Sequence, residues 1–399
     1  MKILMSHNYY RHPGGEDSVF HREQEMLRSA GHEVVEYTRH NNEIVDSILP
    51  NVRVGIRTSW AWDSEHQLRA ILQAEKPQVA HFHNTFPLIS PAAYYACREA
   101  RVPVVQSLHN ARFICPGATF YREGKVCHDC LGKVVPWPGI VHGCYHDSPL
   151  HTATVAGMLT LHRLLGTWQQ AVDAYIVFTE FFRQKFIAAG LPSEKIFLKP
   201  HFLACDPGLR QQGGDYVLYI GRFAPEKGIP TLLEAWSLLR DHIPLRIVGD
   251  GPSRAAFEAI KQERHLSDVY FHRWIAPEHL YPIMKRAAFL VFPSEYQEPF
   301  GIAIIEAFAC GVPVITSRLD TMMELVDDGK TGLHFNSGDP KDLAAKVLWA
   351  WSNPGEMETM GRAARAEYQA KYTARRNYQL LLEIYTRAGS ATAFKAAPA

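Results

Sequence analysis

The fold class of this chain is indicated most clearly by the stretch AAFLVFPSEYQEPFGIAIIEAFACGVPVI, residues 287–315. Its first six residues are apolar and predict a buried strand, and the segment that begins near Gly301 predicts a helix. Glu298 lies at the exit of that strand, and Glu306 lies about one turn into the helix. A strand, a polar exit and a helix in this order form half of a parallel βαβ unit, so further units of this kind are expected in the neighbouring sequence.

The same alternation occurs on both sides of a Gly-Gly pair at 213–214. Before the pair, strands are predicted at 2–7, 33–37, 77–84 and 102–110, with a helix that ends at Gly31. After the pair, strands are predicted at 216–223, 244–251, 269–274 and 288–294, and helices at 228–240, 255–266 and 277–287. Because strands that alternate with helices form parallel sheets, the sequence predicts an α/β protein with two doubly wound Rossmann-like domains.

We place the domain boundaries by these patterns. Residues 1–203 form the first domain, with a Cys-rich insertion at about 112–148, and residues 204–372 form the second. Residues 373–389 are predicted to be a helix that crosses back to the first domain, and the Ala-rich residues 390–399 a flexible tail.

Composition excludes several classes of protein. The 399 residues hold 42 Lys and Arg against 41 Asp and Glu, so nothing favours nucleic acid as a partner. No run of about 18 apolar residues predicts a membrane span. The N-terminus, MKILMSHNYY, becomes polar too soon for a signal peptide and reads as a first strand. We therefore expect a cytoplasmic protein.

Ligands of open parallel sheets bind beyond the carboxyl ends of the strands, and two such sheets facing each other would form a deep cleft. The polar residues at the predicted strand exits are therefore candidates for one site. They are His7, Asn8, Gly14, Gly15, His83, Asn84, His109 and Asn110 in the first domain, and Gly221, Arg222, Lys227, Gly249–Gly251 and 294–301 in the second.

Arg222 and Lys227 follow a strand exit within one loop, YIGRFAPEKGI. Two fixed cations at such an exit suit a diphosphate, because Arg offers a planar fork of donors and Lys a point charge. The alternative is a surface loop with two solvated cations. The nearby IVGDGP segment is typical of a tight turn into a helix, and it need only shape the floor of the site.

The two glutamates suit a polyhydroxylated ligand. Helix donors at Phe300, Gly301 and Ile302 favour an oxygen-rich, partly anionic group, and acids at two depths suit a sugar ring and a ribose. In the alternative interpretation, Glu298 is only an N-terminal helix carboxylate and Glu306 an acid on an amphipathic face. Glu306, however, lies among Ile, Ala and Phe residues, where an acid needs a partner.

The ordered set of these motifs resembles the retaining glycosyltransferase family 4, which has the GT-B fold. The resemblance covers roughly residues 1–385 and rests on Gly14-Gly15, His109, GRFAPEKG, VGDGP and the Glu298-x7-Glu306 spacing. The segments HNTFPLISP and FTEFFRQKF resemble those of bacterial members that build surface polysaccharides.

The resemblance implies a role for each matched residue. Arg222 and Lys227 would neutralise the donor diphosphate in place of a catalytic metal, and Glu298 would bind the hydroxyls of the transferred sugar. Glu306 would bind the ribose, and His109 would lie over the anomeric centre, unless it is a capping or core histidine. Gly15 and the amides of 300–302 would approach the sugar and phosphate. The implied ligands are a UDP- or GDP-linked sugar and a glycan or lipid-linked acceptor.

The Cys-rich insertion departs from the simplest family pattern. Cys115, Cys127, Cys130 and Cys144 have the spacing C-x11-C-x2-C-x13-C, which fits a tetrahedral structural zinc site. Free or disulfide-paired thiols are the alternatives, and an iron–sulfur cluster is disfavoured because the cysteines are too widely spaced. Cys97, Cys205 and Cys310 are predicted to lie in or near the core.

Residues 151–178 carry an apolar helical face with few acids. Such a face packs on its own sheet more often than on a lipid surface, but contact with the inner face of a membrane is the second interpretation.

Two further functions compete with glycosyl transfer: a GT-B-type nucleotide-sugar 2-epimerase, and a non-catalytic carbohydrate-binding protein. The complete set of Arg222, Lys227, Glu298 and Glu306 argues against both.

Overall fold

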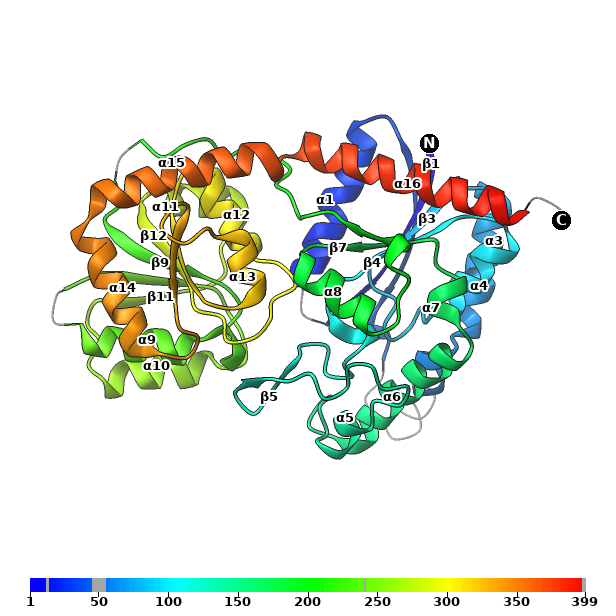
Figure 1. Cartoon of the computed structure of the whole chain (residues 1–399), viewed down its shortest axis with the longest axis horizontal. Helices are drawn as coiled ribbons and strands as arrows, with labels where there is room; N and C mark the ends of the chain where they lie inside the picture. The colour runs from blue at the N-terminus through cyan, green and yellow to red at the C-terminus, as the bar shows by residue number, and fades with distance from the viewer. Residues whose placement is uncertain (12–13, 45–54, 212, 240–241, 397–399) are drawn as a thin grey trace. The chain divides into compact units, whose positions relative to one another are not determined.

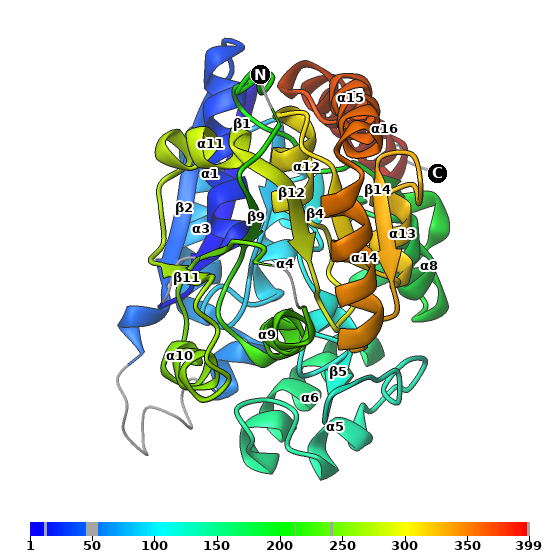
Figure 2. The ribbon, with the colours of Figure 1, turned by 90° about the vertical axis from the view of Figure 1, so that its left-hand side faces the viewer.

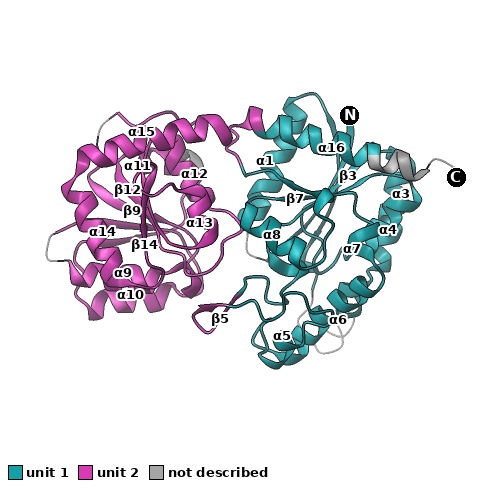
Figure 3. Cartoon of the chain, in the orientation of Figure 1, with its two compact units in different colours: residues 1–120, 127–201, 377–399 teal, residues 121–126, 202–376 magenta. Residues whose placement is uncertain are grey.

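The computed structural model describes residues 1–11, 14–44, 55–211, 213–239 and 242–396. Within these residues the chain forms two compact units (Figure 3). Unit 1 comprises residues 1–120, 127–201 and 377–399, and unit 2 comprises residues 121–126 and 202–376. Residues 397–399 of the predicted tail lie outside the described residues.

Unit 1 is built on a six-stranded parallel sheet with the strand order β2-β1-β3-β4-β7-β8 (Figure 1). Its strands are β1 (Lys2–Tyr9), β2 (Glu33–His40), β3 (Val79–Phe82), β4 (Val104–Ser107), β7 (Ala174–Val177) and β8 (Ile196–Leu198). Its helices are α1 (Gly15–Ser29), α3 (Trp62–Glu75), α4 (Ala92–Glu99), α5 (Trp137–Val141), α6 (Pro149–Leu164), α7 (Thr167–Gln170) and α8 (Glu180–Ala188). Strands β3, β4 and β7 are buried throughout, as strands of a parallel sheet covered on both faces are, and β7 (AYIV) is a continuous apolar run.

Unit 2 repeats this architecture with the strand order β11-β10-β9-β12-β13-β14. The strands are β9 (Tyr216–Ile220), β10 (Leu245–Val248), β11 (Val269–His272), β12 (Ala287–Phe292), β13 (Val314–Ser317) and β14 (Gly332–Phe335). The helices are α9 (Ile229–Leu238), α10 (Arg254–Glu263), α11 (Pro277–Lys285), α12 (Ile302–Ala309), α13 (Asp320–Leu325), α14 (Pro340–Ser352) and α15 (Pro354–Lys371). Helices α9 and α14 lie side by side and bury Leu232 and Val347 in the core of this unit (Figure 2).

The predicted fold is confirmed: each unit is a Rossmann-like domain with a parallel sheet and connecting helices. One predicted element was wrong in part. The stretch 151–178 is not helical throughout, because it continues through α6 and α7 into strand β7. The buried residues of α6, among them Val155, Met158 and Leu159, pack into the unit 1 core.

The last helix, α16 (Ala374–Ala396), is longer than the predicted segment 373–389. Its residues from Asn377 onward belong to unit 1, and Figure 1 shows it in red beside α1 and β3. Tyr378 Oη contacts His32 Nε2 at 2.8 Å, and Tyr385 Oη contacts His81 Nδ1 at 2.8 Å. None of the helices among the described residues is long and apolar enough to cross a membrane.

The strand orders locate one switch point in each sheet. In unit 1 the order reverses between β1 and β3, and in unit 2 it reverses between β9 and β12. The connections that leave adjacent strands on either side of such a point diverge to opposite faces and leave room for a ligand. The exits of these four strands are therefore the first places to look for a functional site.

Candidate functional site

In unit 2 the exit of β9 packs directly against the exit of β12. Gly228 ends the short 3-10 turn Pro225–Lys227 with a positive φ of 71°, and a Cβ at this position would lie 1.8 Å from the carbonyl oxygen of Pro293. Glycine is thus required both for the backbone conformation and for the close approach of the two loops. This approach brings Lys227 to the polar segment that follows β12.

Lys227 and Glu298 form the centre of the site. Lys227 Nζ lies 2.6 Å from Glu298 Oε1 and 3.3 Å from the hydroxyl of Tyr296. Ser294 Oγ donates to Glu298 Oε1 at 2.8 Å, and Tyr296 Oη donates to Glu298 Oε2 at 2.9 Å. Glu298 is buried, so these three donors replace the water that its carboxylate gives up.

Tyr296 is held as a hydrogen-bond donor. Burial, the charge of Glu298 and the hydrogen bond to it raise the pKa of Tyr296 well above its usual value, against the opposing charge of Arg222. The phenol therefore stays protonated at neutral pH. The charge of Arg222 opposes this rise in the pKa of Tyr296, so the guanidinium acts electrostatically on the phenol.

Arg222 is the exposed cation of the site. Its side chain is 60% exposed, and it pairs with Glu226 Oε1 at 2.7 Å within the same loop. An exposed guanidinium with one carboxylate partner keeps further N–H donors for an anion. Arg222 and Lys227 thus differ in setting: the first is at the surface, and the second is largely buried against Glu298.

Helix α12 begins at Ile302, and its N-cap is Gly301, which brings no capping side chain. This confirms the helix start predicted from the sequence. Phe300 and Gly301 are buried, and Glu306 is buried one turn into the helix. The first N–H groups of the helix and the Glu298 carboxylate thus flank the same short segment, 298–302.

In unit 1 the predicted residues lie at the exits of β1, β3 and β4. His109 Nε2 lies 3.0 Å from His83 Nδ1, and the His109 ring stacks on His83 and on His201. Burial and the neighbouring His83, His201 and His7 lower the pKa of His109 well below its usual value, so its imidazole is neutral. His109 also lines a pocket together with Asn84, Asn110 and Arg112.

Gly15 is the first residue of α1 and is exposed. The preceding Gly14 donates its N–H to Asp17 Oδ2 at 2.7 Å, and Asp17 Oδ1 contacts His7 Nε2 at 2.6 Å. Asp17 therefore joins the glycine loop to the end of β1. This placement leaves the backbone of Gly15 accessible, as the prediction for this loop requires.

The four cysteines of the insertion are neighbours in the structure. Burial raises the pKa of Cys130 to about 11, and the charges of Cys115, Cys144 and Cys127 add to the shift. Among the described residues no disulfide is formed, and no three of these sulfurs lie within 4.8 Å of one another. Cys97 and Cys310 are buried as predicted, whereas Cys205 is exposed, so its predicted core position was wrong.

Family models match both units. Residues 14–201 match the model described as "Glycosyl transferase 4-like domain", and residues 207–367 match "Glycosyl transferases group 1". A glycogen synthase of Mycobacterium tuberculosis is 30% identical over 368 residues, which cover 88% of this chain and 86% of that protein. This chain belongs to the GT4 glycosyltransferases. The resemblance and the enzyme class predicted from the sequence are thereby confirmed.

Other relatives of this glycosyltransferase place it among sugar-transferring enzymes. The D-rhamnosyltransferase WbpZ of Pseudomonas aeruginosa is 31% identical over 281 residues, covering 64% of this chain and 72% of that one. The crystal structure of Anabaena Alr3699/HepE in complex with UDP superposes with a TM-score of 0.69 at 17% identity, over 97% of this chain and 100% of that one. At this identity the structural likeness shows the GT-B fold alone.

Sequence reasoning identified the charged residues of this glycosyltransferase site but not the side chains that hold them in place. Ser294, Tyr296 and Glu226 contact the predicted residues and were given no role, although Ser294 and Tyr296 lie in the strand exit beside Glu298. In unit 1, His83 was named only as a strand-exit residue, without a role, and Glu23 was not named. Glu23 sits in the middle of an ordinary amphipathic helix, so no local pattern marks it.

Proposed function

We propose that this glycosyltransferase retains anomeric configuration and transfers a sugar from a nucleoside-diphosphate sugar to a hydroxyl of a glycan or lipid-linked acceptor, in bacterial polysaccharide synthesis. The observation that carries the proposal is the pairing of Lys227 with Glu298 at the switch point of unit 2, with Arg222 nearby. A cation for the phosphates and an acid for the sugar hydroxyls are thus held together before any substrate binds.

The chemistry follows from the charges that develop. When the bond between the anomeric carbon and the phosphate oxygen breaks, negative charge grows on that oxygen and positive charge on the ring. Arg222 and Lys227 would stabilise the leaving diphosphate, as preorganised charges do. The acceptor oxygen would bond to the anomeric carbon from the same face, and its proton would pass to the departing phosphate. No carboxylate nucleophile is needed, and Glu298, which is occupied by three donors, suits a binding role.

Donor binding would exchange partners within the site. Lys227 can turn from Glu298 to a phosphate oxygen only if Glu298 gains other donors, and sugar hydroxyls provide them. Ser294 and Tyr296 would continue to hold the carboxylate during this exchange. Glu306 and the first N–H groups of α12 would take the ribose and the phosphate, and Gly15 would approach the phosphate or acceptor.

We propose a UDP-linked donor first, with a GDP-linked donor as the alternative. The support is the Anabaena structures solved with UDP and with UDP-glucose. The purified protein is incubated with UDP- and GDP-linked sugars, and free nucleoside diphosphate and sugar products are measured. Slow release of nucleoside diphosphate from one donor supports transfer, and an α-linked product from an α-linked donor supports retention. An isomerised donor would indicate an epimerase, and donor binding without turnover would indicate a binding protein.

Chelation tests the proposed absence of a catalytic metal. If side chains neutralise the diphosphate, we expect excess EDTA to leave the initial rate essentially unchanged. A prompt loss of activity that Mg²⁺ restores would contradict the roles proposed for Arg222 and Lys227.

We further propose that unit 1 contacts the inner face of a membrane through its exposed apolar surface. Residues Val134, Val135, Trp137, Val141, Leu161 and Leu164 are exposed. The carbonyl of Val134 accepts from Arg163 at 2.9 Å, which joins this loop to the end of α6, and Lys133 Nζ lies 5.6 Å from the centre of the Trp137 ring. Asp147 is the single acid in residues 131–165, so an anionic lipid surface suits this face.

Co-sedimentation with vesicles tests the membrane proposal. We expect the protein to bind vesicles that contain anionic lipid and to bind neutral vesicles less. Trp137→Glu should abolish this binding, while Trp274→Glu, which alters an exposed tryptophan of unit 2, should not. Equal binding by both variants would overturn the assignment.

A further inference from the structure

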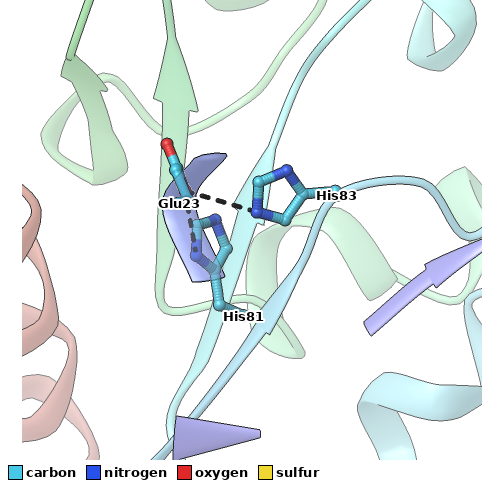
Figure 4. A group of neighbouring side chains, drawn as sticks. All are labelled: Glu23, His81 and His83. Atoms are coloured by element: carbon cyan, nitrogen blue, oxygen red, sulfur yellow. Dashed lines mark ion pairs between the residues drawn. The ribbon is translucent and has the colours of Figure 1, made fainter. Parts of the chain in front are cut away.

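A group of buried polar side chains in unit 1 lies behind His109. Glu23 comes from α1, His81 lies in β3, His83 directly follows β3, and Lys199 follows β8 (Figure 4 shows the first three). All four side chains are buried. Lys199 Nζ donates to Glu23 Oε1, and His83 Nε2 lies 3.3 Å from Glu23 Oε2. The proposed transfer chemistry assigns none of them a role, yet burying so many ionisable groups is costly.

A metal ion is one explanation for this group. Ligand atoms of Glu23, His81 and His83 lie within 4.8 Å of one another, the only such group found among the described residues. His81, however, already uses both ring nitrogens: Nδ1 contacts Tyr385 Oη at 2.8 Å, and Nε2 contacts Ser107 Oγ at 2.9 Å. The ammonium of Lys199 also supplies the positive charge that Glu23 needs. Asn377 Oδ1 holds that ammonium from α16 at 3.1 Å.

The hydrogen bonds can be assigned a direction, starting from Glu23. Burial raises the pKa of Glu23, but Lys199 and His83 outweigh this effect and hold it well below the usual value, so Glu23 is a carboxylate. His83 Nε2 faces the Glu23 carboxylate at 3.3 Å, where a ring lone pair would be repelled and an N–H attracted, and therefore His83 Nε2 carries the proton. A His83 ring that holds this single proton has its lone pair on Nδ1, which lies 3.0 Å from His109 Nε2. His109 must donate from Nε2, and its own lone pair is on Nδ1.

We propose that Lys199, Glu23 and His83 form a buried relay that fixes the tautomer of His109, so that His109 Nδ1 is always a hydrogen-bond acceptor. Glu23 and His83 are positioning residues, because they act only through His109. The acceptor nitrogen suits a hydroxyl of the bound sugar, and this last step alone rests on the proposed function. The ammonium of Lys199, at the opposite end of this row of side chains from His109, sets the donor–acceptor direction of every contact in the relay.

The tautomers can be read directly in the resting protein. Long-range proton–nitrogen correlation spectra of ¹⁵N-histidine-labelled protein distinguish a protonated ring nitrogen from an unprotonated one, and His109→Gln and His83→Asn identify the two signals. We expect His109 and His83 each to carry the proton on Nε2 and the lone pair on Nδ1. A charged His109, or a proton on its Nδ1, would overturn the proposal.

Glu23→Gln should reverse the donor–acceptor direction of the contacts from Glu23 to His109. Lys199 will bind the amide oxygen, so the amide NH₂ will point to His83 Nε2, which must then accept. His83 would donate from Nδ1, and His109 would carry its proton on Nδ1 instead of Nε2. We expect kcat to fall roughly 10²-fold, with a smaller change in KM for the donor, because the residues proposed to bind its diphosphate and ribose belong to unit 2. An unchanged His109 tautomer in a folded Glu23→Gln protein would refute the relay.

Tyr385→Phe is the matched control. It removes a buried hydroxyl from His81, beside Glu23, without touching the relay, so the His109 signals and the rate should stay unchanged. Metal analysis of the purified wild type and of His83→Asn adds a second check. If the variant holds one equivalent of metal less than the wild type, a metal ion and not Lys199 supplies the positive charge beside Glu23, and the proposal is overturned. The spectra do not depend on turnover, so a protein that transfers no sugar could still carry the relay.

Discussion

At the scale of single residues, the site of unit 2 is organised by the burial of one carboxylate. Glu298 is paired with Lys227 and receives hydrogen bonds from Ser294 and Tyr296, so its cost of desolvation is offset locally. The same contacts hold Lys227 at the loop that also carries Arg222. A site of this kind is ready for a charged ligand before the ligand arrives.

Lys227→Ala and Glu298→Gln should each reduce kcat/KM on the order of 10²–10³-fold, because each removes a preorganised contact to the donor. Initial rates with the donor found in the screen provide the measurement. Lys330→Ala, which alters an exposed lysine paired with Asp327, is the control and should leave the rate unchanged. Near-native rates in either site variant, with circular dichroism unaltered, would show that the site is misplaced.

The Glu16 carboxyl predicts a pH-dependent contribution to stability. Burial raises its pKa to about 7, and Asp17 adds to this, whereas Tyr10, Arg112 and Asn110 oppose it. The folded state therefore binds more protons than the unfolded state between about pH 4.5 and 7. The contribution of Glu16 is full below this window and is lost as the pH rises through 7.

Glu16→Gln should remove this dependence. Urea unfolding of both proteins at pH 5, 6, 7 and 8 should show the wild type losing stability relative to the variant as the pH increases. If the difference in unfolding free energy between the wild type and the variant stays constant from pH 5 to pH 8, Glu16 titrates near its ordinary pKa in the folded state.

At the scale of elements, the Cys-rich insertion contains little regular structure. Between η2 (Ala111–Phe113) and α5 it contributes only the two-residue strands β5 (Tyr121–Arg122) and β6 (Lys125–Val126). Tyr121 of this hairpin packs edge-on to Tyr296, with ring centres 6.5 Å apart. A segment with so few backbone pairings benefits from a cross-link, and we propose that zinc provides it.

Elemental analysis should find one zinc per chain, bound by Cys115, Cys127, Cys130 and Cys144. Metal binding should draw the four sulfurs together as thiolates, despite the raised pKa of Cys130. Without a strong chelator, thiol reagents should then react with Cys205 and spare these four. Absence of zinc together with four reactive thiols would rule out the metal site.

At the scale of the whole molecule, the chain ends by returning to the sheet in which it began. Asn377 Nδ2 donates to the carbonyl of Pro200 at 2.6 Å while its Oδ1 accepts from Lys199. Tyr378 and Tyr385 add contacts to His32 and His81. Helix α16 therefore completes the buried polar group of unit 1 with residues that are far away in the sequence.

Asn377→Ala should destabilise unit 1 by about 1–3 kcal/mol, because it leaves the Pro200 carbonyl and one Lys199 donor without a partner. Thermal unfolding followed by circular dichroism should show a lower first transition. Arg376→Ala, one residue earlier and exposed, serves as the control. Equal melting of the two variants would show that Asn377 contributes nothing measurable to holding α16 on unit 1.

The order of strands and helices could be predicted because apolar periodicity is a local property. Strands such as β9, β10 and β12 and the start of α12 lie where the pattern placed them. The stretch 151–178 failed because its last apolar residues, which form β7, look the same in a buried strand as in a buried helix. The prediction that Cys205 lies in or near the core failed because the sequence around a cysteine does not show whether it is buried.

The two parallel sheets and the family could be predicted from the sequence, and Arg222, Lys227, Glu298, Glu306 and His109 could be named as candidates, because strand exits and spaced charges are local features of the sequence. The partners that hold these side chains are visible only in the folded chain. Glu298, which follows β12, is paired with Lys227, which follows β9. His109 contacts His83, which in turn lies against Glu23 and so is linked to Lys199. Desolvation makes such partners necessary, but their identity depends on which distant segments the sheet brings together.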